Sequence, residues 1–113
     1  METLLRGIAD RDPQFTASYE IIFYRDSMDV PETSEICQTI VNCSKEAIKL
    51  TPAFIGGSGW LDTQIIWGKG IPAVAYGPAG DGDHAAIEWV DLETVMDAAR
   101  VQELVIRRFC GEK

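Results

Sequence analysis

The sequence predicts an α/β fold in which short strands alternate with helices. Apolar residues recur at steps of four and three across 32–49, which is the pattern of a helix with one packed face. A continuous apolar run at 71–76 is bounded by turn residues and is typical of a strand covered on both faces. With 113 residues, 46% hydrophobic and 25% charged, the chain has the size and composition of one small globular domain.

The first 25 residues predict a short helix followed by a strand. Helical spacing of Leu4, Leu5 and Ile8 indicates a helix over 2–10, which Pro13 brings to an end. From residue 15 to 25 apolar and polar side chains then alternate, as they do in a strand with one buried face.

Two longer helices are predicted, one in the middle and one at the end of the chain. Asp29 and Glu32 have the spacing of a capping box for the helix at 32–49. Asp91 is expected to cap the last helix, and Gly111 to stop it. The packed side of the middle helix is predicted to be Ile36, Ile40, Cys43, Ala47 and Leu50, and that of the last helix Leu92, Val95, Met96, Ala99, Ile106 and Phe109.

Between these helices lie a short strand at 52–55, a glycine-rich turn, a short helix at 60–68 with Leu61 and Ile65 inward, and the strand at 71–76. The turn contains Gly57, Ser58 and Gly59 and precedes a helix. Its backbone N–H groups could receive an anion, although a plain tight turn is the commoner use of such residues.

Charge and cysteine usage exclude several classes of function. The formal net charge of −8 argues against binding to nucleic acid or to an anionic membrane. Cys37, Cys43 and Cys110 have no CxxC spacing, which favours reduced thiols. The first residues also lack the pattern of a signal peptide, so we expect a cytoplasmic protein.

His84 is the only histidine of the chain, and it follows a flexible run of glycine, proline and aspartate. An imidazole can be a metal ligand or a base, but a lone histidine in a loop is more often plain surface. Glu88 would share a face with His84 if the segment were helical, which gives at most two ligands. Because zinc sites need three or four protein ligands, this chain alone cannot supply a conventional one.

Taken together, these motifs resemble the C-terminal end of one metallopeptidase family. In order they are Asp62, a Gly-Ile-Pro strand at 70–72, a Gly-Pro loop at 77–78, and His84 four residues before Glu88. The family is the co-catalytic zinc family of acetylornithine deacetylase, succinyl-diaminopimelate desuccinylase, aminoacylase and glutamate carboxypeptidase. By this resemblance, residues 1–25 are the end of its α+β dimerisation lid, and 26–113 the C-terminal portion of its α/β catalytic domain.

The resemblance implies a role for each matching residue. His84 would be the last protein ligand to one metal of a zinc or cobalt pair, and the only one of the ligands carried here. Gly57, Ser58 and Gly59 would approach the free carboxylate of the substrate, Asp62 would hold their turn, and Glu88 would support the loop around His84. Trp60 and Leu61 depart from the family, which commonly has a small hydroxyl residue before the aspartate.

The resemblance also implies what the chain would need from elsewhere. The other metal ligands and the glutamate that acts as general base lie N-terminal to the matching region in the family. The chain would thus be the C-terminal portion of an enzyme that hydrolyses N-acyl amino acids or dipeptides, with no catalytic residue of its own and inactive in isolation. It would form homo-oligomers and require the N-terminal portion as a partner. A non-catalytic dimerisation or interaction module, pairing through the strand at 15–25, is the alternative.

Overall fold

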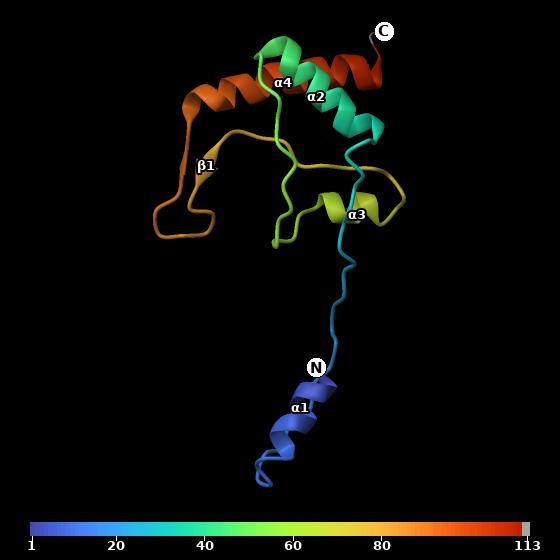
Figure 1. Ribbon diagram of the computed structural model, residues 1–113, viewed down its shortest axis with the longest axis vertical. Coiled ribbons are helices and arrows are strands. Elements are labelled where there is room, and N and C mark those ends of the chain that lie inside the picture. Colours follow the sequence, from blue (N-terminus) through green and yellow to red (C-terminus); the bar gives the residue numbers. More distant parts are fainter. Residues whose placement is uncertain (112–113) are drawn as a thin grey trace.

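Two packed helices, α2 (Glu35–Ala47) and α4 (Leu92–Cys110), form the structural centre of the chain (Figure 1). The structure is a computed structural model that describes residues 1–111. α2 lies across α4, and the two bury a small core between them. Its members are the buried residues Cys37, Val41, Cys43, Ser44, Ala98 and Val101.

The caps of α4 confirm what the sequence predicts. The Asp91 carboxylate accepts a hydrogen bond from the Glu93 backbone N–H at 2.9 Å, which satisfies a donor that the first turn leaves free. At the other end Gly111 has a φ of 79°, a left-handed conformation that costs glycine little. α4 therefore begins and ends where its sequence indicates, and spans 19 residues.

α2 begins later than predicted. Ser34 occupies the N-cap position and the helix starts at Glu35, so the capping box expected from Asp29 and Glu32 does not form. The helix ends at Ala47, and Lys49 then turns the chain with a φ of 59°. Residues 32–34, which are expected to be helical, lie in a turn instead, and the Ser34 N–H donates to the Pro31 carbonyl to close it.

An ion pair also joins the two helices. Arg108 donates a hydrogen bond to the Glu46 carboxylate, and this bond raises the pKa of the guanidinium above its usual value. Both side chains are well exposed, so water screens the pair and the apolar core supplies most of the attraction between the helices.

The predicted packed side of α4 is wrong. Ala98 and Val101 are the buried residues of this helix. Their face is rotated away from the expected stripe, which remains accessible: Leu92 is 75%, Met96 59% and Ile106 62% exposed. α2 is the helix that packs on α4, and it covers the side that carries Ala98 and Val101, so the more apolar side stays exposed.

The strand predicted at 15–25 pairs with no other segment of the described chain. It follows α1 (Glu2–Ala9) as an extended stretch, and Figure 1 shows it leading from α1 toward the helix pair. A strand is stable only when a neighbour takes up its backbone hydrogen bonds. Here Ile21 is 69%, Ile22 88% and Phe23 62% exposed, so neither bonding edge nor apolar face is covered.

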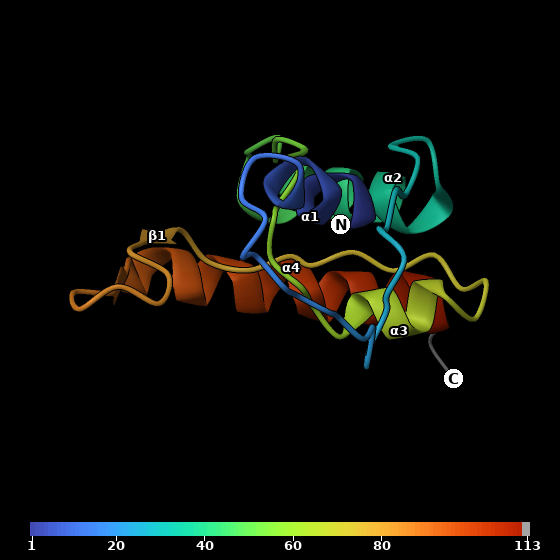
Figure 2. The same cartoon turned by 90° about the horizontal axis from the view of Figure 1, so that it is seen from below.

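The sheet in the described residues is a two-stranded antiparallel one, between β1 (Gly80–Asp81) and β2 (Trp89–Val90). The segments 52–55 and 71–76, where strands are expected, pair with no other segment among residues 1–111, so the predicted parallel arrangement stays a prediction. Segment 71–79 runs along α4, as Figure 2 shows. The Gln102 side chain donates to the Tyr76 carbonyl at 3.2 Å, and the Ser44 hydroxyl lies 3.3 Å from the Tyr76 hydroxyl.

The fold therefore consists of helices and one small sheet, and its overall shape is open. α3 (Thr63–Trp67) lies apart from the helix pair. The radius of gyration is 20.4 Å, whereas a compact domain of this length has about 13 Å. No helix in the described part of the chain combines the length and apolar character needed to cross a membrane.

Candidate functional site

His84 lies in the loop of a short hairpin, which we call the His84 hairpin (residues 80–90). Gly80 pairs with Val90 and Asp81 with Trp89, and residues 82–88 connect the two strands. The Ala85 N–H bonds to the Gly82 carbonyl at 2.8 Å and closes a turn around His84. The side chain of His84 is exposed, so its imidazole is accessible to solvent and to a ligand.

The backbone of His84 itself is unusual. Its φ of 63° is in the left-handed region, which most residues other than glycine enter at a cost, although asparagine, aspartate and histidine are enriched there. Lys49 is the other such residue between positions 1 and 111, and it follows a helix end, where this conformation is common. At His84 the conformation belongs to the tight turn closed by the Ala85 N–H and the Gly82 carbonyl, because His84 is the third residue of that turn, where a positive φ is common.

Two glycines are required for the hairpin. A Cβ on Gly82 would lie 2.2 Å from the Ile87 carbonyl oxygen, and Gly82 has a φ of 83°. A Cβ on Gly80 would lie 2.4 Å from the Trp89 carbonyl oxygen. Because backbone atoms cannot move aside like the end of a flexible side chain, the loop around His84 depends on glycine at both positions.

Glu88 is the last residue before β2, and its side chain is exposed. Residues 82–88 form a loop rather than a helix, so His84 and Glu88 do not share a helical face as the spacing suggested. The role of Glu88 in supporting the loop stays a prediction.

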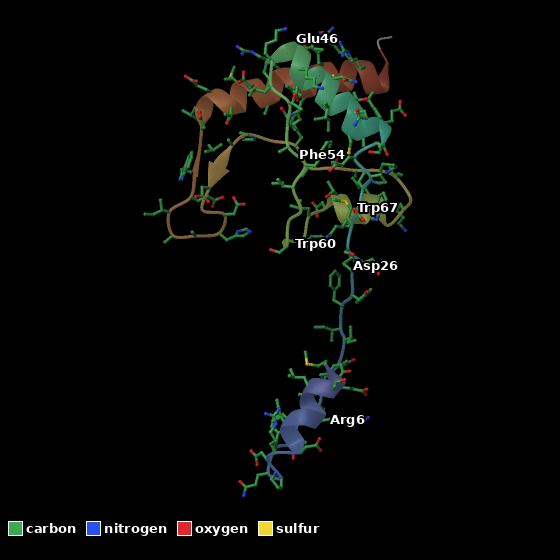
Figure 3. All side chains as sticks on the ribbon, viewed as in Figure 1. Arg6, Asp26, Glu46, Phe54, Trp60 and Trp67 are labelled. Atoms are coloured by element: carbon green, nitrogen blue, oxygen red, sulfur yellow. The ribbon has the colours of Figure 1, made fainter. Side chains whose placement is uncertain are left out.

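The glycine turn (residues 56–59) is the second predicted element of the site. Gly57, Ser58 and Gly59 are all exposed, and a Cβ added to either glycine would meet nothing within 4 Å. The turn leads to the bend where Trp60 lies, away from the helix pair (Figure 3). Its backbone is therefore open to a partner or a ligand.

Asp62 occupies the N-cap position of α3 but makes no side-chain hydrogen bond to the start of that helix. Its carbonyl accepts a bond from the Ile65 N–H at 3.0 Å. Its predicted part in holding the glycine turn remains a prediction.

The glycine turn and the loop of the His84 hairpin extend on the same side of the α2–α4 pair, as Figure 1 shows in green and orange. Among residues 1–111, no three histidine, cysteine, aspartate or glutamate side chains are grouped so that they could hold a metal ion. His84 thus stands alone as a ligand-type imidazole in this part of the chain.

The chain matches no protein-family model, no curated protein and no solved structure.

The three thiols are free: Cys37 and Cys43 are buried in the core and Cys110 is exposed, as expected for reduced cysteines. One residue of the hairpin's anchorage, Thr94, was not singled out from the sequence. Its position three residues after the capping Asp91 is the one feature of the sequence that could have indicated it.

Proposed function

We propose that this chain is the C-terminal portion of a dinuclear metal-dependent amidohydrolase that cleaves N-acyl amino acids or dipeptides. The observation that carries the proposal is the exposed His84 at the turn of a glycine-dependent hairpin. Such a hairpin holds a single imidazole in place for a metal whose other ligands come from outside these residues. Zinc or cobalt would supply the activation of water, and the N-terminal portion the general base.

The uncovered apolar surface supports a partner portion. The packed core is small, while one side of α4 and the segment 15–25 expose large apolar side chains. Exposed large apolar side chains of this kind are typical of an interaction surface in soluble proteins. We propose that residues 26–111 complete their α/β architecture against the N-terminal portion of the catalytic domain, with 52–55 and 71–76 as strands of a shared sheet. Residues 1–25 would end the lid domain.

The substrate end of the site would lie at the glycine turn. Gly57, Ser58 and Gly59 have accessible backbone, which suits close approach to a free carboxylate. Asp62 would steady this turn, and Glu88 the loop of His84. The same enzyme would be homo-oligomeric, and it would be cytoplasmic, in keeping with its free thiols.

Cobalt titration tests the metal assignment on the chain itself. Paramagnetic Co²⁺ should broaden the NMR resonances of the His84 imidazole at lower cobalt concentrations than those of the acidic side chains, because neutral imidazole binds cobalt well. A His84→Ala chain should lose this first phase of broadening, and Glu88→Gln should keep it. Broadening that begins at acidic side chains and leaves His84 unaffected would contradict the assignment.

The alternative, a non-catalytic interaction module, is favoured by one observation. Residues 15–25 pair with no other segment of the described chain and expose large apolar side chains, which is the form that adds to another sheet. Under this alternative, the chain forms a concentration-dependent dimer and has no affinity for metal.

An edge charge tests whether segment 15–25 mediates association. Ile22→Lys should lower the self-association constant at least about tenfold, because a lysine in the middle of a pairing strand opposes edge-to-edge contact. Ile55→Lys is the matched control, since Ile55 is 90% and Ile22 88% exposed but Ile55 lies outside the segment. Sedimentation velocity over a range of concentrations measures both. Equal effects of the two variants would show that the segment is not the interface.

A further inference from the structure

The His84 hairpin leads through Asp91 directly into α4, and Ala79, the residue before β1, is hydrogen-bonded to this junction. The ladder of β1 and β2 would continue with Ala79 opposite Asp91, and the Asp91 N–H does bond to the Ala79 carbonyl at 2.9 Å. In a regular antiparallel ladder, the Ala79 N–H would bond back to the Asp91 carbonyl. Here that carbonyl already faces the first turn of α4, where it accepts from the Val95 N–H at 3.2 Å.

Thr94 supplies the missing bond. The Ala79 N–H donates to the Thr94 hydroxyl oxygen at 2.9 Å, and that hydroxyl lies 2.7 Å from the Asp91 carbonyl, to which it donates. The hydroxyl is thus inserted between the two groups of the ladder and relays the bond from one to the other. Only a side chain that both accepts and donates can do this.

We propose that Thr94 is a positioning residue: its hydroxyl extends the hairpin ladder onto α4 and so fixes where His84 is presented. α4 is held in turn by its buried contact with α2 through Val101. The orientation of the imidazole thereby depends on the helix pair rather than on the loop alone. We call the hydrogen bonds that link Ala79, Thr94 and Asp91 the Thr94 joint. A role of this joint in metal binding rests on the proposed function, but the joint itself is independent of any metal.

The variants Thr94→Val and Thr94→Ser separate the hydroxyl from the shape of the side chain. Valine keeps the shape and loses the bond, whereas serine keeps the hydroxyl. Thr63→Val is the matched control, because Thr63 also lies at the start of a helix and its buried hydroxyl has no hydrogen-bond partner. Hydrogen exchange of the Ala79 and Asp91 amides, and the ¹H–¹⁵N NOE of residues 82–88, are measured on the whole chain without metal.

Thr94→Val should speed exchange at Ala79 about fivefold, the effect of losing one hydrogen bond, and lower the NOE of the loop. Thr94→Ser and Thr63→Val should match the parent. An unchanged Thr94→Val chain, or a Thr94→Ser chain that behaves like Thr94→Val, would overturn the inference. Cobalt broadening of His84 is read separately. Its absence beside an intact Thr94 effect would reject the metal assignment and leave the joint standing.

Discussion

Val101→Asp should abolish the α2–α4 pair. Val101 is 0% exposed at the centre of the core, so the variant loses the burial of a valine and places a carboxyl among apolar side chains. Together these changes should cost at least about 3 kcal/mol of unfolding free energy, a large share for so small a core. Circular dichroism should show most of the helical signal lost at neutral pH.

The effect should depend on pH in a defined direction. Burial raises the pKa of a carboxyl in the folded state, so the part of the penalty that comes from ionisation is absent below the unfolded pKa of about 3.9 and grows as the pH rises above it. The part that comes from the lost valine does not depend on pH. Helicity of the variant should therefore be higher at pH 3 than at pH 7, each compared with the parent chain. Ile106→Asp on the same helix is the control and should change helicity little, because Ile106 is 62% exposed. Equal losses in both variants would contradict the observed packing of α4.

Gly82→Ala should open the His84 hairpin while leaving the helix pair intact. The new methyl group would lie 2.2 Å from the Ile87 carbonyl oxygen, at a residue whose φ is 83°. Left-handed backbone alone costs a non-glycine residue about 1–2 kcal/mol, and the clash adds to it. A ladder of two residue pairs cannot offset that cost.

Nuclear Overhauser contacts between Asp81 and Trp89 measure the opening directly, since the two residues face each other in the ladder. They should disappear in Gly82→Ala, and cobalt broadening of His84 should weaken with them. Gly57→Ala is the matched control, because a Cβ there meets nothing within 4 Å. Persistence of the Asp81–Trp89 contacts in Gly82→Ala would show that the hairpin tolerates a side chain at this position.

The ends of α4 were predictable because capping is local. Asp91 bonds within two residues of itself, and Gly111 adopts a conformation that depends on its own backbone. The buried face of α4 was not predictable in this way. Periodicity identifies the most apolar stripe of a helix, but α2 packs on the side carrying Ala98 and Val101, where small side chains allow a close approach.

Strand patterns had a different limit. The alternation at 15–25 and the apolar run at 71–76 indicate strands, but neither segment specifies which other segment it would pair with, and both are unpaired among residues 1–111. The hairpin at 80–90 cannot be predicted from periodicity, because its paired stretches are two residues each and are too short for a pattern to show.

The candidate site was partly accessible from sequence. His84 stands out as the only histidine, and the glycines around it indicate an irregular backbone, which its φ of 63° bears out. The hydrogen bond between the Ala79 N–H and the Thr94 hydroxyl could not be predicted from the sequence. It brings together positions 79 and 94 across a turn whose geometry the residue types alone do not specify.

Hydrolysis by a reassembled enzyme tests the central proposal most directly. The chain would be mixed with a separately expressed N-terminal portion of an enzyme from the deacetylase family, with zinc or cobalt, and assayed on N-acyl amino acids and dipeptides. We expect no turnover from either portion alone, turnover from the mixture, and none when the chain carries His84→Ala. Turnover by the isolated chain that His84→Ala abolishes, or turnover by the mixture that survives His84→Ala, would contradict the role proposed for this residue.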